Sequence, residues 1–427
     1  MLQIQKEKSP LFYFLLSLPA TAMGFALCVQ LSTLSWKLDQ LGLKEADLGK
    51  VWSAGPIAGI VGQILFGLIS DKAWFWGGRR RPYILIGGVI TALAIFGLSQ
   101  LEFLNAKFPM LGLVVCATSI ALMLDLAVNI GFNPTRSLIS DVTSEGADRT
   151  KGYTIMQLVS GSFGVAAYFF GALLGKEFLF YFGVVLVLLF TIIPTLLIQE
   201  PKELAVANPK SKIQNLKSTT DWPNFLKLCF AHAFTWFGIQ SMFIFFGGFL
   251  KYRISNAEVE SGLLQQLHAV FPNVESYGRM QDISFTLMFL VGSLLPAFAL
   301  EPLAKKFGRV RVHLTTVAIM SASYFALYKI ADSQLSVFFF MCMLGIGWGA
   351  VVSLPFAIFS EMVDKNRMGW FMGLFNLSVV IPQLLVSFTV GSFLQNSTDK
   401  SLVFLISGIA LAISAVLWLL VKEKTKE

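Results

Sequence analysis

The chain has 427 residues, of which 55% are hydrophobic and only 14% are charged, and its mean hydropathy is +0.69. Soluble domains carry about 25% charged residues, so this composition excludes an ordinary soluble protein and indicates an integral membrane protein. The formal net charge of +8 is typical of membrane chains that retain Lys and Arg in cytoplasmic loops, and we expect no nucleic acid partner.

Twelve long apolar stretches follow one another along the chain. A helix needs about 20 residues to cross the hydrocarbon core of a membrane. We therefore expect an all-α integral membrane protein with twelve transmembrane helices in the lipid bilayer. The stretches are 11–36, 51–70, 82–101, 108–135, 152–175, 178–199, 228–250, 283–300, 312–328, 333–360, 368–398 and 401–421.

The distribution of basic residues predicts the orientation of these helices. An even number of spans places both termini on one side, and that side collects 22 Lys and Arg residues against 10 on the other. Cytoplasmic loops retain the excess of positive charge, so we predict that both termini are cytoplasmic. The first stretch is too long for a signal peptide and lacks a small-residue cleavage site, so we expect it to remain as a helix.

A hydrophilic run between the sixth and seventh stretches divides the chain into six plus six. The predicted domains are an N-terminal six-helix bundle at 1–199, a cytoplasmic linker at 200–227 and a C-terminal six-helix bundle at 228–427. Two such repeats are the plan of the major facilitator superfamily, whose members bind substrate near the midplane between the halves. We therefore expect that fold.

The loop after the second stretch has a counterpart in the second half of the chain. Asp71 precedes Gly78 by the same number of positions as Glu301 precedes Gly308, so the two loops match in spacing. A carboxylate at the end of a helix can hold a basic cluster in one conformation and release it when the halves move. We predict a gating role for these acids and for the basic residues Arg79, Arg80, Arg81 and Arg309; alternatively, the arginines only enforce topology.

The fourth stretch carries the most informative polar pattern. Asp125, Asn129, Asn133 and Arg136 recur at spacings close to whole turns of a helix, which places them on one helix face. An ionised carboxylate in lipid costs several kcal/mol, so Asp125 must face a cavity or a partner, as a proton-coupling carboxylate would. Arg136 lies about 16 Å further along the helix, and we assign it to charge compensation or to sugar hydroxyls. The alternative is a structural ion pair with other helices.

Further polar side chains interrupt the other apolar stretches. Amides donate and accept hydrogen bonds and an aromatic face covers the apolar face of a pyranose, so this combination suits a hydroxyl-rich ligand. Helix-to-helix hydrogen bonding explains each amide equally well. The candidate substrate-binding residues are Gln30, Asn129, Arg136, Gln157, Trp236, Gln240, Asn376 and Gln383.

The remaining titratable residues do not indicate an enzyme. The three His and four Cys residues form no metal-binding pattern, and neither a nucleophile motif nor a cofactor loop is present in the sequence. We expect neither a metal nor a cofactor. His232 lies within an apolar stretch, and we favour a packing role over a proton relay.

Several of these motifs together resemble a known family. They are Gln30-Leu-Ser32, Gly55-Pro56-Ile-Ala-Gly59, Ser70-Asp71 with Gly78-Arg79-Arg80-Arg81-Pro82, Leu124-Asp125 through Asn129 to Arg136 and Asp141, Pro355-Phe356-Ala357, and Leu377 through Val380-Ile381-Pro382-Gln383. Over most of its length the chain resembles the sucrose/proton symporters of plants and their animal and bacterial relatives. These are close to the glycoside-pentoside-hexuronide transporters of the major facilitator superfamily.

The resemblance implies uptake of a disaccharide or glucoside together with a proton. It assigns the proton to Asp125, an essential role to Arg136, and positions in the sugar cavity to Gln30 and, more loosely, to Asn129 and Gln383. Phe245-Phe246-Gly247-Gly248 stands where the plant proteins carry acidic residues, so maltose competes with sucrose as the sugar. The short termini and compact loops are typical of bacterial members, which implies a monomer in the bacterial inner (plasma) membrane.

Other functions remain open at this point. A sodium-coupled glycoside symporter would need clustered acidic ligands, and a proton-driven exporter of small molecules would prefer a greasier cavity with fewer amides. A non-transporting sugar sensor would bind its ligand without moving it.

Overall fold

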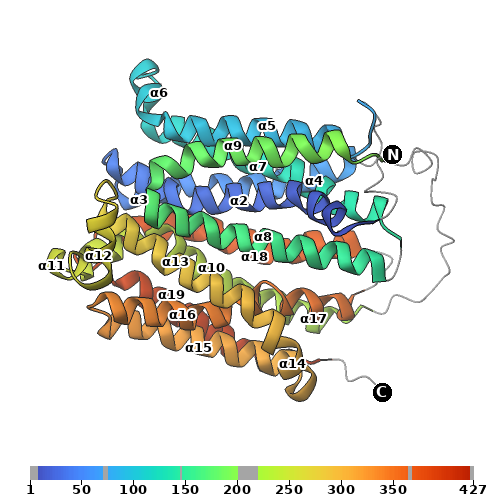
Figure 1. Ribbon diagram of the computed structural model, residues 1–427. Coiled ribbons are helices and arrows are strands. Elements are labelled where there is room, and N and C mark those ends of the chain that lie inside the picture. Colours follow the sequence, from blue (N-terminus) through green and yellow to red (C-terminus); the bar gives the residue numbers. More distant parts are fainter. Residues whose placement is uncertain (1–7, 71–75, 145–146, 201–219, 364–367, 424–427) are drawn as a thin grey trace. The chain divides into compact units, whose positions relative to one another are not determined.

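The computed structural model describes residues 8–70, 76–144, 147–200, 220–363 and 368–423, and its regular elements there are helices (Figure 1). Each of the twelve expected stretches coincides with a helix or with a helix that is broken once. Nine helices in these ranges are long and apolar enough to cross a membrane, and a bent pair makes a tenth. The remaining two stretches form the shorter helices α4 (Ala54–Ser70) and α19 (Leu402–Trp418), so the expected all-α membrane fold is confirmed.

The chain divides into two compact units, Met1–Leu41 with Ala54–Ile213, and Gly42–Ser53 with Gln214–Glu427. Most of the expected linker, residues 201–219, lies outside the described residues. The units differ from the expected bundles in one respect, because residues 42–53 pack with the second half of the chain.

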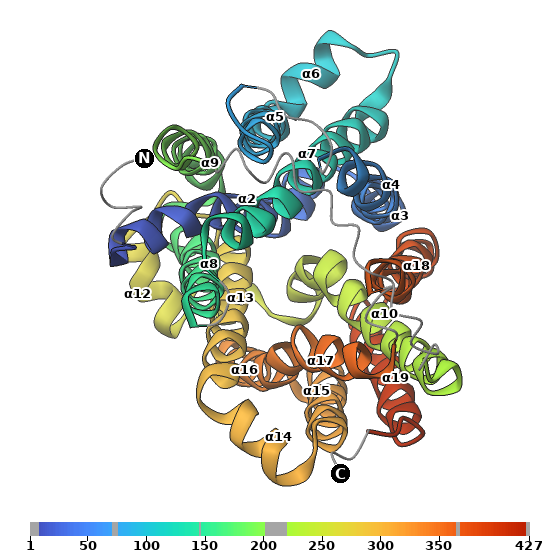
Figure 2. The same cartoon turned by 90° about the vertical axis from the view of Figure 1, so that its right-hand side faces the viewer.

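The first unit is built around α2, which packs against α5, α7, α8 and α9, while α4 packs on α7 (Figures 1 and 2). The packing is close because glycines remove side chains at the contacts: a Cβ added at Gly87 of α5 would lie 2.8 Å from the main-chain nitrogen of Gly131 in α7. The helices of this unit, besides α4, are α2 (Pro10–Gln40), α5 (Arg81–Ser99), α6 (Leu101–Lys107), α7 (Gly112–Val142), α8 (Ala147–Leu174) and α9 (Lys176–Leu197).

In the second unit α10 packs against α18 and α19, α13 packs against α16, and α15 packs against both α16 and α19. Its core includes Phe225, Phe359, Phe371, Phe375 and Trp418, all at most 1% exposed. The helices of this unit, besides α19, are α3 (Glu45–Trp52), α10 (Trp222–Arg253), α11 (Asn256–Val259), α12 (Gly262–Val270), α13 (Ser276–Leu295), α14 (Glu301–Phe307), α15 (Arg309–Ile330), α16 (Gln334–Val351), α17 (Leu354–Met362) and α18 (Met368–Gln395), with a π-helical segment η2 (Pro296–Leu300).

Three spans are broken, and proline follows or marks each break. The second span is interrupted at Ser53, just before Pro56, and α16 and α17 are separated just before Pro355. The eighth span bends by 46° between α13 and the helical segment that follows Pro296. Proline lacks the N–H of a regular helical hydrogen bond, which explains why the helices break at these places.

The helix α3 joins the second unit through close contacts with α18. A Cβ added at Gly49 would overlap the main-chain oxygen of Ser387, and one added at Gly391 would overlap that of Glu45. Glu45 also forms a salt bridge of 2.8 Å with Lys400. The two helices therefore touch backbone to backbone, and an ion pair closes one end of the contact.

The charges within the helices differ from expectation. The sequence pattern placed charged residues only in the fourth span, but α13 begins at Ser276 and so includes Arg279 and Asp282, both 0% exposed. Lys176, 4% exposed, is the first residue of α9. The apolar stretches were bounded at their charges, and this rule ends a helix too early when its charged residues are buried.

Candidate transport site

In the first unit, Asp125 is the buried carboxylate at which three helices meet. Its side chain on α7 is 7% exposed, and its Oδ2 accepts a hydrogen bond of 3.0 Å from Nε2 of Gln30 on α2. A Cβ added at Gly55 of α4 would lie 3.4 Å from the same oxygen, so the backbone of α4 passes directly beside the carboxylate. The amide and the missing side chain leave room for a carboxylate that can exchange a proton with a neighbour.

Asn129 lies one turn further along α7 and is partly committed to its own helix. Its Nδ2 donates a hydrogen bond of 2.8 Å to the main-chain oxygen of Asp125. A Cβ added at Gly62 would lie 2.8 Å from Cβ of Asn129, so α4 again passes close to the polar face of α7. The side-chain oxygen of Asn129 makes no hydrogen bond within the described part of the chain. The side chain of Asn133 lies outside the described residues.

Arg136 presents an exposed side chain at the far end of this face. Its guanidinium lies 4.4 Å from the ring centre of Phe132, and its main-chain oxygen accepts a hydrogen bond of 3.0 Å from Tyr153. Within the described ranges it forms no salt bridge. The alternative of a structural ion pair therefore finds no support among these residues, and the donors of the guanidinium remain available to a ligand.

In the second unit, two of the expected amides meet. Nε2 of Gln383 on α18 donates a hydrogen bond of 3.2 Å to Oε1 of Gln240 on α10, and Gln240 is 5% exposed. This contact fits helix-to-helix bonding, but it leaves the amide nitrogen of Gln240 and the amide oxygen of Gln383 for other partners. Asn376 is half-buried and Gln157 of the first unit is exposed, and neither forms a hydrogen bond within the described residues.

Trp236 is tied to the histidine that lies one turn before it. Its Nε1 donates a hydrogen bond of 2.8 Å to Nε2 of His232, whose ring stacks on Phe375 at 4.9 Å. His232 is 0% exposed, which agrees with the packing role that the sequence favours. The ring of Trp236 meets that of Trp348 edge to face at 6.1 Å, so the indole stands in an aromatic cluster with its polar group already satisfied.

The predicted gating loop of the first unit is held by two carboxylates. Glu200 accepts hydrogen bonds of 2.8 to 2.9 Å from the main-chain N–H groups of Arg79, Arg80 and Arg81, where α5 begins. Asp141 accepts from the side chains of Arg79 and Arg80 at 3.0 and 3.3 Å. The expected acid, Asp71, lies outside the described residues.

The second unit repeats this arrangement in outline. Arg309 at the start of α15 forms a salt bridge of 2.5 Å with Glu361, and Glu423 accepts a hydrogen bond of 3.3 Å from the main-chain N–H of Val310. Glu301 begins α14, but its side chain lies outside the described residues. In both units, a carboxylate after the final span of the unit binds the N-terminus of the helix that follows the Gly-Arg loop.

The sequence interpretation missed three buried charges. Lys176 donates hydrogen bonds to the main-chain oxygen and to Oγ of Ser32, at 2.8 and 3.2 Å. Arg279 donates to the main-chain oxygen of Phe271 at 2.5 Å, and Asp282 lies one turn after it on α13. The absence of proline between Arg279 and Leu295 is the signal that extends this helix beyond its apolar part.

Two helical units with polar and charged side chains buried between membrane-spanning helices define a membrane transport protein rather than an enzyme. Comparison with protein families agrees: the Major Facilitator Superfamily matches residues 269–427, and the family described as MFS/sugar transport protein matches residues 13–262, more than half of the chain. The chain belongs to the MFS/sugar transport protein family.

Individual relatives are consistent with this family. The sucrose transport protein SUC4 of Arabidopsis thaliana is 25% identical over 87% of this chain and 82% of its own length. The general alpha-glucoside permease of Schizosaccharomyces pombe is 32% identical, over 30% of this chain and 25% of its own. Among solved structures, the nucleoside transporter NupG superposes with a TM-score of 0.73 at 14% identity, covering 96% of this chain and 100% of NupG, which supports the fold.

Proposed function

We propose that the protein is a proton-coupled symporter that imports a disaccharide or glucoside, with sucrose and maltose as the first candidates, by alternating access. The sucrose and alpha-glucoside transport proteins among its relatives support the substrate class. The observation that carries the coupling is the hydrogen bond between the buried Asp125 carboxylate and Gln30. In this proposal the protein is a monomer in a bacterial inner membrane, with both termini in the cytoplasm.

Asp125 is the proton carrier in this mechanism. A buried carboxylate is far more stable when protonated, so the neutral form accompanies the sugar through the membrane and the charged form requires access to water. Gln30 serves both states, because its amide donates to the ionised carboxylate and its oxygen can accept from the protonated one. Each proton that moves inward through about 100 mV releases about 2.3 kcal/mol, which supports a roughly 50-fold sugar gradient.

The sugar contacts are proposed for side chains of both units. Gln240 and Gln383 keep further amide groups beside their mutual hydrogen bond, and Arg136 keeps guanidinium donors for a ligand. Gln30 and Asn129 lie next to the proton carrier and would couple its state to the hydroxyls of the ligand. Trp236 offers a ring face, and Gln157 and Asn376 complete the candidate set.

The two Gly-Arg loops are the proposed gating elements. The salt bridges of Arg79 and Arg80 with Asp141, and of Arg309 with Glu361, hold each loop against the end of a spanning helix. Breaking and reforming such partly exposed pairs costs little free energy, about 0 to 1 kcal/mol each, which suits elements that change partners in every transport cycle.

The decisive experiment is uptake of labelled sucrose and maltose into proteoliposomes with an imposed inward proton gradient, with and without a protonophore. We expect accumulation of at least one sugar that the protonophore abolishes. Accumulation that follows a sodium gradient and ignores the proton gradient would instead identify the sodium-coupled alternative. Sugar loss from preloaded vesicles under the opposite gradient alone would identify an exporter.

Replacement of the carboxylate tests the residue assignment. We expect Asp125→Asn to abolish proton-driven accumulation and to preserve exchange of labelled for unlabelled sugar, because a neutral amide mimics only the protonated state. The matched control is Asp47→Asn, which removes an exposed acid of α3 that pairs with Lys50 at 2.8 Å. Uphill uptake that survives in Asp125→Asn would transfer the proton to another acid, of which the buried Asp282 is the first to test.

A further inference from the structure

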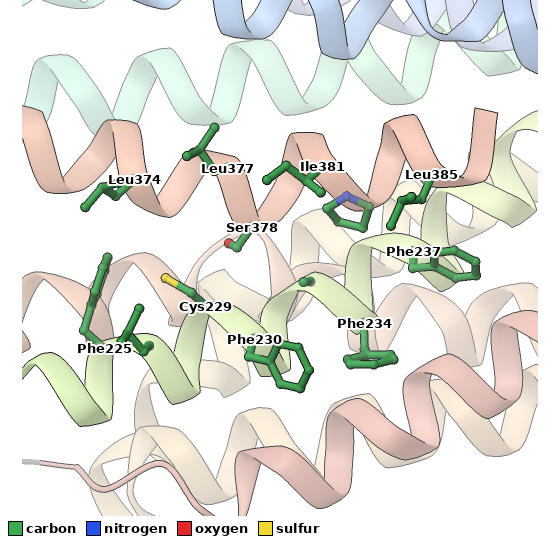
Figure 3. Close-up of a pocket in the computed structure, with 13 residues that line it drawn as sticks. Phe225, Cys229, Phe230, Phe234, Phe237, Leu374, Leu377, Ser378, Ile381 and Leu385 are labelled. Atoms are coloured by element: carbon green, nitrogen blue, oxygen red, sulfur yellow. The ribbon is translucent and has the colours of Figure 1, made fainter. Parts of the chain in front are cut away.

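An apolar groove runs along the second unit between α10 and α18, away from the polar side chains assigned to the sugar (Figure 3). It encloses about 490 Å³. Phenylalanines of α10 form one wall, and leucine and isoleucine side chains of α18 form the other. The lining residues are Phe225, Leu226, Cys229, Phe230, Ala233, Phe234, Phe237, Leu374, Leu377, Ser378, Ile381, Pro382 and Leu385.

The chemistry of this groove excludes a sugar as its occupant. Its lining contains no charged or amide side chain, and its two polar side chains are those of Cys229 and Ser378. The Ser378 hydroxyl already donates to the main-chain oxygen of Phe375 at 2.6 Å. Sugar hydroxyls placed here would lose their hydrogen bonds to water without replacement, whereas a hydrocarbon chain would lose nothing.

The length of the groove fits one leaflet of a membrane. Phe225 and Phe237, at its two ends on α10, are twelve residues apart, which corresponds to about 18 Å along a helix. One leaflet contributes about half of the roughly 30 Å hydrocarbon core. The side chains of Leu226, Phe230 and Ile381 are 58%, 59% and 50% exposed, so the groove is open along its length.

One end of the groove has the features of a membrane interface. Trp222 and Trp370 lie just before its first lining residues, are 40% and 49% exposed, and have their rings 5.8 Å apart. Tryptophan concentrates at the level of the lipid headgroups. Exposed lysines at this end are Lys227 and Lys422, the latter anchored through main-chain hydrogen bonds of 2.6 and 2.8 Å with the Asn224 amide.

We propose that this groove binds one acyl chain of an anionic glycerophospholipid, whose headgroup lies beside Trp222 and Trp370. Lys227 and Lys422 would attract the negative headgroup, since juxtamembrane basic residues contribute about 1 kcal/mol each toward anionic lipid. Asp221 is also at this end, but its carboxylate accepts from the main-chain N–H of Asn224 at 3.2 Å and caps α10. The lipid fills the groove and so fixes the distance between α10 and α18, the helices that carry Gln240 and Gln383.

The test uses the full-length protein in vesicles that contain phosphatidylglycerol with a photoreactive diazirine in its acyl chain. After irradiation, mass spectrometry maps the labelled peptides. We expect labelling to concentrate in 225–237 and 374–385. Ala233→Phe places a ring inside the groove and should reduce this labelling about fivefold, equivalent to about 1 kcal/mol. Ala322→Phe, at an exposed alanine of α15, is the matched control and should leave the labelling unchanged.

Further arms keep the proposal open to refutation. A phosphatidylcholine probe should label the groove about fivefold less, and the double change Lys227→Gln with Lys422→Gln should remove that preference. Cys229→Leu replaces Ala233→Phe if the latter does not fold. Equal labelling by the two lipids, labelling spread evenly over the apolar helix faces, or loss of the label on addition of sucrose or maltose would each overturn the proposal.

Discussion

At the residue scale, a single carboxylate can organise several parts of a unit, as Asp148 does outside the membrane spans. Asp148 accepts hydrogen bonds from the side chains of Lys8 and Tyr13 and from the main-chain N–H of Ser144. Partial burial alone would raise the pKa of this carboxyl, but these donors and the positive charge of Lys8 hold it below its usual range. The start of α2 is thereby fixed to the start of α8.

The lowered pKa of Asp148 gives a signed pH dependence. Its contribution to stability is complete above the unfolded-state pKa of about 3.9 and is lost as the pH falls through the lower folded-state value. We expect Asp148→Asn to lower stability by about 1 kcal/mol from pH 5 to pH 8, and the difference from wild type to shrink below about pH 4. Thermal unfolding in detergent across this range measures it.

The control for this prediction is Asp47→Asn, which removes a more exposed ion pair on α3. Exposed pairs contribute little, so this variant should unfold with the wild type. Equal destabilisation by both substitutions at pH 7, or a difference that grows as the pH falls, would contradict the role assigned to Asp148.

At the element scale, the contact between α3 and α18 depends on residues without side chains. A Cβ at Gly391 meets the main-chain oxygen of Glu45, which cannot rotate away, whereas Gly373 on the same helix has nothing within 4 Å. These two glycines therefore provide a matched pair. Both occupy ordinary helical backbone, so only the neighbour differs between them.

We expect Gly391→Ala to push α3 away from α18 and to cost about 1–3 kcal/mol. Gly373→Ala should cost nothing, and its higher helix propensity should even stabilise α18 by a few tenths to about 1 kcal/mol. Apparent melting temperatures of the purified variants give the comparison. The same change in both variants would show that the close approach of α3 is not needed for stability.

Elements were also where sequence interpretation succeeded and failed most clearly. Twelve spans follow from hydropathy because lipid solvates any apolar surface, and the glycine and proline positions at Gly55 and Pro56 lie beside a real break. The hydrogen bond between Gln30 and Asp125 was not predictable, since nothing in one helix specifies which neighbour it meets. Arg279 and Asp282 were missed because a buried charge looks the same in sequence as a loop charge.

At the scale of the whole molecule, the two units repeat one device with different strength. Glu200 binds three main-chain N–H groups where α5 begins, and Glu423 binds the N–H of Val310 where α15 begins. The sequence revealed the Gly-Arg loops at matching positions in the two halves. It did not reveal these two acids, since both follow the last span of a unit and appear in the sequence as ordinary tail or linker residues.

The unequal number of hydrogen bonds predicts an unequal response. We expect Glu200→Gln to destabilise the protein by at least about 1 kcal/mol more than Glu423→Gln, because bonds to a charged acceptor contribute about 1.5–3 kcal/mol each. Thermal unfolding ranks the variants, and sugar uptake should fall in the same order. A larger effect of Glu423→Gln would contradict the assignment of Glu200 as the main anchor.

The placement of α3 has a consequence for how the polypeptide can be divided. Chain order assigns residues 42–53 to the first half, yet they pack on α18, with Glu45 paired to Lys400. A fragment that begins after the linker would therefore expose the backbone surface around Gly391 and should aggregate or be degraded when expressed alone. Coexpression with a fragment that ends at the linker should rescue it, because α3 is supplied in trans and acts as a built-in clasp for reassembly.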